Sequence, residues 1–286
     1  MTGSSTLGAR LLCEVGGRLL EGPAWDAARR RLLFVDILGS ELLSCAWPPG
    51  ELERTPTSET CSAWIPRDGG GSVVASRDGV HVVDADGATE KVVEIEADRP
   101  TNRSNDAKCD PVGRLWVGTM ADDEKACEGA LYRIDRDGRV RQIISPVSIS
   151  NGLGWSPDGL LMYYIDSPTR RIDVFDYDLR TGVPGSRRLF VDVSALPGVP
   201  DGLAVDGEGC LWVAFWDGGA VHRFAPDGTR IAQVTLPAAR PTSCAFVSDA
   251  LDQLVITTAA APDGSGGDLY VCDAGVSGLP VPAYRG

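Results

Sequence analysis

Apolar residues along this chain occur in short runs that are rich in β-branched and aromatic side chains and are separated by turns with glycine and aspartate. Runs such as 32–37, 115–119 and 211–215 are typical of β-strands. The pairs Asp137-Gly138 and Asp227-Gly228 predict tight hairpins between successive strands. No stretch has a convincing amphipathic-helix period. The pattern therefore predicts an all-β protein.

A longer pattern joins these runs, because a similar stretch of sequence recurs six times. The first residues of the six copies are Glu21, Cys61, Asn105, Asn151, Asp201 and Ser243. Subtraction of these numbers gives spacings of 40, 44, 46, 50 and 42 residues. A repeat of about 40–50 residues made of short strands is typical of a β-propeller. We therefore expect a six-bladed β-propeller with four antiparallel strands per blade, formed by a single domain over residues 1–286.

The two ends of the chain have to complete this ring. Residues 9–15 precede the first full copy and are strand-like, so we expect them to form the outermost strand of the last blade. Residues 275–286 show no strand pattern and are expected to be irregular.

The first position of the repeat holds a carboxylate or an amide in four of the six copies, namely Glu21, Asn105, Asn151 and Asp201. Each of these residues, taken alone, could be an ordinary turn residue. Their shared register favours another interpretation, because equivalent positions in different blades lie at one height and face one axis. Two carboxylates and one or two amide oxygens suit a hard cation such as Ca²⁺, Mg²⁺ or Mn²⁺. Zn²⁺ and Fe(II) are the other divalent candidates.

Charge and composition narrow the class of protein. The formal net charge is -13, with 40 acidic and 27 basic residues, which disfavours a nucleic-acid partner. The acidity is compatible with a neutral or cationic ligand, and solubility explains it equally well. No signal peptide is visible in the first ten residues, and no apolar run approaches the roughly 20 residues of a membrane-spanning helix. We expect a cytoplasmic protein without a membrane partner, either a monomer or a weak homo-oligomer.

Cysteine and histidine chemistry contributes little to the expected site. The eight cysteines have no C-x-x-C spacing, and in a cytoplasmic chain such cysteines are usually small buried hydrophobes. The two histidines, His81 and His222, fall in third-strand positions away from the axis. A Ser-His-Asp triad or a histidine metal site is therefore not expected.

Polar residues around the third copy are further candidates. Arg103 just precedes Asn105, and beside a metal it would donate hydrogen bonds to substrate oxygens, although it could also be a solvated loop charge. Asp106 and Lys108 are two residues apart on a strand and therefore point the same way, so we expect them to form a buried structural ion pair.

The ordered motifs of the chain resemble those of the SMP-30/gluconolactonase/regucalcin family of six-bladed propellers. The resemblance covers essentially the whole chain and includes Glu21-Gly-Pro-Ala-Trp25, Asn102-Arg-Ser-Asn-Asp106, Gly118-Thr-Met120, Ile149-Ser-Asn-Gly-Leu153, Pro200-Asp-Gly-Leu203 and Leu211-Trp-Val-Ala214. It implies that Glu21, Asn151 and Asp201 bind a divalent metal and that Arg103 and Asn105 bind substrate. It also implies that Asp201 is the proton donor and acceptor.

The activity that the resemblance implies is hydrolysis of a sugar-acid lactone, of the gluconolactone, xylonolactone or arabinonolactone type, to the free aldonic acid. Some members of the family carry a further substrate-contacting glutamate before the Gly129-Ala-Leu-Tyr132 motif. In this chain the loop over 121–128 is shorter, and either Glu124 or Glu128 could take that role.

Three other functions remain open from the sequence. One is a related metal-dependent esterase or phosphotriesterase, because the fold does not determine the substrate. Another is a non-catalytic, regucalcin-like calcium-binding propeller with a structural cation. A protein-interaction propeller is the third, and the four oxygen side chains at the axis argue against it.

Overall fold

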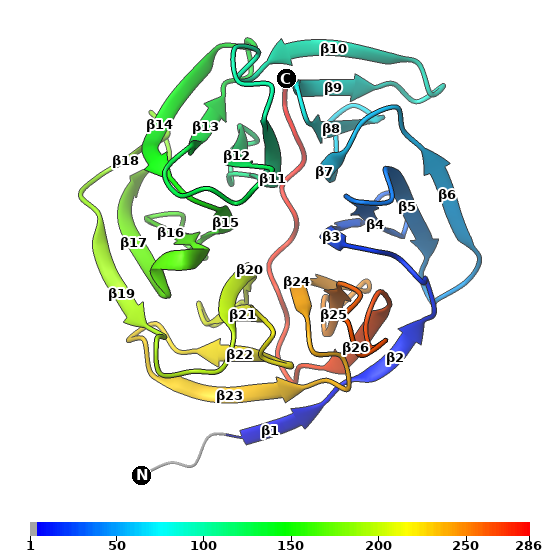
Figure 1. Ribbon diagram of the computed structural model, residues 1–286, viewed down its shortest axis with the longest axis vertical. Helices are drawn as coiled ribbons and strands as arrows, with labels where there is room; N and C mark the ends of the chain where they lie inside the picture. The colour runs from blue at the N-terminus through cyan, green and yellow to red at the C-terminus, as the bar shows by residue number, and fades with distance from the viewer. Residues whose placement is uncertain (1–4) are drawn as a thin grey trace.

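Six β-sheets surround a central axis in the computed structural model, which describes residues 5–286 (Figure 1). The predicted six-bladed propeller is confirmed. Residues 1–4 of the predicted domain lie outside the described residues.

Each blade begins at the axis and ends at the rim. The innermost strands are β3 (Leu20–Asp26), β7 (Cys61–Pro66), β11 (Asn102–Cys109), β15 (Ser150–Trp155), β20 (Val199–Val205) and β24 (Pro241–Val247). The second strands are β4 (Arg31–Asp36), β8 (Ser72–Ser76), β12 (Leu115–Ala121), β16 (Leu161–Asp166), β21 (Leu211–Trp216) and β25 (Gln253–Thr258). The third strands are β5 (Glu41–Ala46), β9 (Gly79–Val83), β13 (Gly129–Ile134), β17 (Arg171–Asp178), β22 (Ala220–Phe224) and β26 (Leu269–Asp273).

The outer strands differ more from blade to blade. Those of the first five blades are β6 (Leu52–Pro56), β10 (Thr89–Glu94), β14 (Val140–Val147), the two short strands β18 (Val183–Pro184) and β19 (Arg188–Asp192), and β23 (Arg230–Thr235). One turn of 3₁₀-helix, η1 (Ser167–Thr169), follows β16 and is the only helical element in residues 5–286. None of the helical structure described could cross a membrane.

The N-terminal segment closes the ring, as predicted. Strand β2 (Arg10–Cys13) pairs antiparallel with β26 and forms the outer edge of the sixth blade. Strand β1 (Ser5–Gly8) was not predicted, and it pairs in parallel with β23 as a fifth strand of blade 5. The start of the chain therefore ties the last two blades together and covers edges that could otherwise pair with another chain.

The hydrophobic core is divided into six clusters, and each cluster fills the space between two neighbouring blades. The fully buried Trp116 and Trp212 are the largest side chains in two of them. Burying a large apolar side chain contributes about 1.5–3 kcal/mol. Since every blade shares a cluster with each neighbour, the ring is held together by the same contacts that fill its core.

All six innermost strands break their pairing register near their first residues. Such bulges re-aim side chains and often border functional sites. Gly22 and Gly152 have positive φ values of 55° and 21° in these breaks. A Cβ atom at Gly152 would lie 2.7 Å from the carbonyl oxygen of Asp201, in the next blade. Glycine is therefore required for the inner strands to approach one another here.

The C-terminal tail is irregular, as predicted, but it has a defined path. After β26 it crosses the centre of the ring from blade 6 towards blades 2 and 3 (Figure 1). Backbone hydrogen bonds hold both ends of the crossing, from Gly278 to Leu251 and from Tyr284 to Pro66. Tyr284 is buried in the cluster between blades 2 and 3.

All eight cysteines are free thiols, and six of them are buried.

Candidate active site

The four oxygen-bearing residues that share a register in the sequence lie at the starts of four innermost strands. Glu21, Asn105, Asn151 and Asp201 belong to β3, β11, β15 and β20, and each is no more than 8% exposed. Asn105 donates from Nδ2 to Oδ1 of Asn151 across the blade boundary, at 3.1 Å. Two of the four residues are therefore in direct contact across a blade boundary.

Hydrogen bonds fix the orientation of the two amides. Asn151 donates from Nδ2 to Oγ of Ser167 (2.9 Å), and Ser167 donates in turn to the carbonyl oxygen of Pro200 (2.7 Å). Asn105 also donates to the carbonyl oxygen of Ser150 (3.0 Å). The orientation of the Asn151 amide is thus fixed by one donated and one accepted hydrogen bond, and its oxygen keeps a second lone pair.

The carboxyl groups of Glu21 and Asp201 are buried and accept few hydrogen bonds from the protein. Glu21 accepts one hydrogen bond from its neighbouring backbone, the N–H of Gly22 at 3.0 Å. Burial, together with the nearby charge of Asp106, raises the pKa of Glu21 to about 8. Burial, followed by the charges of Glu21 and Asp106, raises the pKa of Asp201 well above its usual value. Oδ1 of Asp201 is a buried atom with no hydrogen-bond partner among the described residues.

This donor set fits a divalent cation. Two buried carboxylates and a correctly turned amide oxygen are hard oxygen ligands. The charge of Glu21 disfavours the ionised form of Asp201, and the charge of Asp106 disfavours ionisation of both. Arg103 offsets this in part for both groups, and Lys108 does so for Glu21. A bound cation would relieve that repulsion and would give Oδ1 of Asp201 the partner that it lacks.

The predicted ion pair between Asp106 and Lys108 is wrong. No salt bridge within 4.0 Å joins them in the described chain. Nζ of Lys108 instead donates to the carbonyl oxygen of Leu203 in β20, at 2.6 Å. Asp106 lies near both site carboxylates, and burial raises its own pKa. The sequence analysis therefore missed Asp106 as a third carboxyl at the axis, although its place next to Asn105 in the bulge was a usable signal.

Arg103 lies beside the site with most of its side chain buried, being 11% exposed. Its Nη1 donates to Oδ1 of Asn105 at 2.8 Å and to the carbonyl oxygen of Ser104 at 2.9 Å. Its Nε lies 3.9 Å from Oδ1 of Asp122, which also forms a two-point ion pair with Arg77 at 2.7 and 3.0 Å. The guanidinium is thus held next to Asn105.

The acidic residues of the loop over 121–128 differ in their exposure and in their contacts. Glu124 is exposed and has a φ of 58°, while Glu128 forms an ion pair with Lys125 at 3.0 Å. Asp122, which the sequence analysis did not consider, is the acidic residue of this loop that contacts Arg103. Its position directly after the second strand of blade 3 was the signal that could have identified it.

The two histidines lie outside the candidate active site. His81 and His222 lie in the third strands β9 and β22, as expected, and His222 packs between Phe215 and Phe224. Burial lowers the pKa of His222 to about 4, so it is neutral at pH 7.

A group of acidic and thiol side chains, Asp206, Glu208 and Cys210, also lies close together. The Asp206 carboxylate already accepts hydrogen bonds from Trp212 Nε1 (2.9 Å) and Arg223 (2.7 Å), besides two backbone N–H groups. This group is therefore explained as the anchor of the turn between β20 and β21.

Comparison with known proteins identifies the family of this chain. Residues 19–260 match the family model described as SMP-30/gluconolactonase/LRE-like region. The chain belongs to this family. Regucalcin of Danio rerio is 36% identical over 285 residues, which cover 96% of this chain and 95% of that protein.

Two solved structures extend the comparison. The calcium-binding protein regucalcin from Agrobacterium tumefaciens has a TM-score of 0.94 and 31% identity, with complete coverage of both chains. A gluconolactonase from Xanthomonas campestris has a TM-score of 0.77 and 26% identity, covering 96% of this chain and 90% of that one. Members of the family with a lactonase description and with a calcium-binding description thus both share this fold.

Proposed function

We propose that this protein is a metal-dependent hydrolase that opens a sugar-acid lactone to the free aldonic acid. The observation that carries the proposal is the buried pair Glu21 and Asp201 beside the oriented amide oxygen of Asn151, with Oδ1 of Asp201 lacking any hydrogen-bond partner in the described chain. Such a set is costly to bury unless a cation occupies it. Similarity to a gluconolactonase at 26% identity supports the choice of reaction.

The proposed metal ligands are Glu21, Asn151 and Asp201. Their all-oxygen character favours Ca²⁺, Mg²⁺ or Mn²⁺ over softer metals, with Zn²⁺ and Fe(II) as the remaining candidates. The description of the Agrobacterium protein as calcium-binding favours calcium within that group. When bound, such a cation polarises an ester carbonyl and makes nearby water more acidic.

Substrate binding is assigned to Arg103 and Asn105. Arg103 has five N–H donors, and the two hydrogen bonds described above involve Nη1, so donors on Nη2 remain for substrate oxygens. The charged pair Arg77–Asp122 beside it makes this side of the site polar. Hydroxyl groups of a sugar suit such a surface better than the apolar groups of a lipophilic ester, which argues against the esterase and phosphotriesterase alternatives.

Proton transfer is assigned to Asp201. A carboxylate has two oxygens, so one can face a cation while the other exchanges a proton. With Oδ1, which has no hydrogen-bond partner in the described chain, facing the cation, the second oxygen would accept a proton from the attacking water. The same group would then return the proton to the ring oxygen as the ester bond breaks. General acid–base help of this kind contributes typically 10²–10⁴-fold to a rate.

A non-catalytic, calcium-binding role is the second candidate, because the same oxygen set would hold a structural cation and a solved relative at 31% identity is described as calcium-binding. The two candidates differ in turnover alone. Either one requires Glu21 and Asp201 for the cation.

The test is acid release from a panel of sugar lactones by chelator-treated protein, re-supplied in turn with Ca²⁺, Mg²⁺, Mn²⁺, Zn²⁺ and Fe²⁺. Spontaneous opening is subtracted using the same buffer and metal without protein. Turnover that returns with metal supports the lactonase. Metal binding without turnover on any lactone favours the calcium-binding alternative, and failure to bind any of these metals contradicts both.

A further inference from the structure

A largely apolar cavity of about 350 Å³ lies on the propeller axis between the candidate active site and the C-terminal tail. Its lining begins directly after the site residues, at Gly22 and Asp106, and continues to positions three or four residues later in the innermost strands. They include Ala24, Cys109, Trp155, Val205 and Phe246. At about 3.3 Å per residue, the cavity therefore begins beside the candidate active site and extends roughly 10 Å along the axis.

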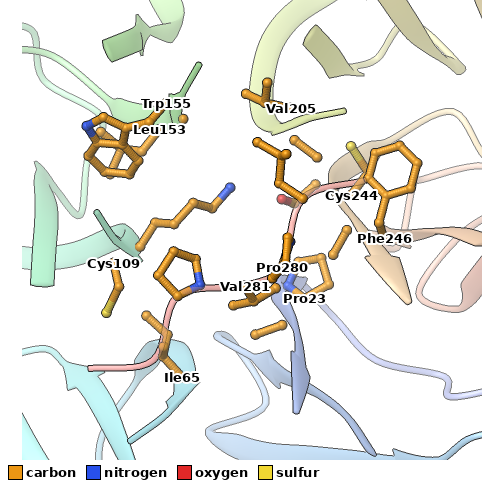
Figure 2. A pocket seen from close by; sticks show the side chains of 18 of the residues that line it. Pro23, Ile65, Cys109, Leu153, Trp155, Val205, Cys244, Phe246, Pro280 and Val281 are labelled. Carbon is orange, nitrogen blue, oxygen red and sulfur yellow. The ribbon is translucent and has the colours of Figure 1, made fainter. Parts of the chain in front are cut away.

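The C-terminal tail forms the outer wall of this cavity. Pro280 and Val281 lie across it between the side chains of opposite blades (Figure 2). Residues 279–283 make no backbone hydrogen bond in the described chain, whereas the tail is anchored on both sides of that stretch, at Gly278 and Tyr284. The same two residues, Pro280 and Val281, also line a hollow on the outer face. The span over the cavity is therefore not held in place by backbone hydrogen bonds of its own.

The cavity contains one positive group. Lys108 extends from β11 in blade 3 to the carbonyl oxygen of Leu203 in blade 5, so its side chain crosses part of the axis. That single hydrogen bond leaves two of its three N–H donors without a partner in the described residues. The only other charged lining residue is Asp106, at the end next to the candidate active site. A ligand in the cavity would thus meet mostly apolar walls, the Lys108 ammonium and, at the end next to the candidate active site, the Asp106 carboxyl.

We propose that this cavity binds a small amphiphilic monocarboxylate, such as a medium-chain fatty acid, with its carboxylate on Lys108 and its chain among Trp155, Val205 and Phe246. The volume falls in the range of about 300–1,000 Å³ that small-molecule sites occupy. It is about the volume that a dozen water molecules occupy in the liquid, and a ligand of about ten non-hydrogen atoms would fill it. The inference does not rest on the proposed lactonase activity.

The experiment is isothermal titration of the full-length, metal-loaded protein with octanoate and, separately, with the neutral alcohol octan-1-ol. The expected result is saturable one-to-one binding of octanoate, at least tenfold tighter than binding of the alcohol. Lys108→Met should weaken octanoate at least tenfold and leave the alcohol unchanged, whereas Lys108→Arg should keep octanoate affinity within a few-fold. Absence of octanoate binding, or equal binding by Lys108→Met, would overturn the proposal.

A variant that fills the cavity tests the position of the ligand without changing Lys108. Ala245 lines the cavity, and Ala245→Phe should abolish binding of both octanoate and the alcohol. The melting temperature of this variant shows whether its fold is intact. Its lactone turnover, measured on the same preparation, shows whether the candidate active site is intact. Octanoate binding that survives in a folded Ala245→Phe protein would place the ligand elsewhere and contradict the proposal.

Discussion

Asn105 donates a hydrogen bond from Nδ2 to Oδ1 of Asn151 at 3.1 Å, which joins the innermost strands of blades 3 and 4 at the axis. Arg103 in turn donates to Oδ1 of Asn105 at 2.8 Å. A residue proposed to bind substrate therefore also orients a residue proposed to bind metal. The two functions of the site are coupled through amide groups.

The support of Asn151 by Ser167 gives the first prediction. Ser167→Ala removes the acceptor of the Asn151 Nδ2 hydrogen bond and lets the amide rotate. Loss of such outer-shell support typically reduces metal affinity by 10–100-fold. We expect that loss, measured by titrating chelator-treated protein with Ca²⁺, without a large change in melting temperature. The control is Ser186→Ala, an exposed serine, which should bind metal normally. Unchanged affinity in Ser167→Ala would contradict the proposed role of Asn151.

The stability of the metal-free protein should depend on pH through Glu21. Its pKa is raised from the usual 4.5 to about 8, mainly by burial. Below pH 4.5 the carboxyl is protonated in both the folded and the unfolded state. Between pH 4.5 and 8 the folded state retains the proton that the unfolded state has lost, so the free energy of unfolding decreases as pH rises through this window.

The slope from one such group is at most about 1.4 kcal/mol per pH unit. Urea unfolding of chelated protein at several pH values should show this decrease, and Glu21→Gln should reduce it. Saturating Ca²⁺ should oppose it, because the cation favours the ionised carboxylates. A metal-free protein that gains stability over the same window would refute this view of the site electrostatics.

Arg103 should contribute to substrate binding more than to metal binding. Arg103→Met removes hydrogen bonds from a charged donor, each worth about 1.5–3 kcal/mol, so kcat/KM should fall roughly 10–100-fold, mostly through KM. Arg188→Met, on the rim strand β19 and paired with Asp176, is the control and should be neutral. Steady-state kinetics on the preferred lactone makes the comparison. An unchanged KM in Arg103→Met would exclude this residue from the substrate site.

Ring closure by the N-terminus predicts an effect on stability and association. Deletion of residues 1–13 removes β1 and β2 and exposes the edge of β26. We expect a lower melting temperature and concentration-dependent association, because uncovered edge strands pair with other chains. Deletion of residues 1–8 leaves β2 in place and should have a smaller effect. Light scattering combined with thermal unfolding distinguishes the two, and equal behaviour would show that β2 does not hold the ring closed.

The fold could be predicted because it repeats. Six copies with short strands and Asp-Gly turns determine the blades, and the shared register of Glu21, Asn105, Asn151 and Asp201 determines which residues meet at the axis. This inference needs only the alternation of strand side chains and the equivalence of blades.

Contacts between copies that are not equivalent could not be predicted in this way. Asp106 and Lys108 point to the same side of β11, but alternation does not show that Leu203 of another blade offers Lys108 a nearer acceptor. The path of the tail across the axis and the approach of Asp122 to Arg103 are likewise set by packing between distant segments. These features distinguish this chain from a generic propeller.

The most direct test of the account measures metal content and lactone turnover together in the wild type, Glu21→Gln and Asp201→Asn. We predict that Glu21→Gln loses turnover in parallel with metal. For Asp201→Asn we predict that turnover per bound metal falls by about 10²–10⁴-fold, the usual contribution of a general acid–base group. Circular dichroism should show an unchanged fold in both. Near-wild-type turnover in both variants, with metal still bound, would contradict the proposed site.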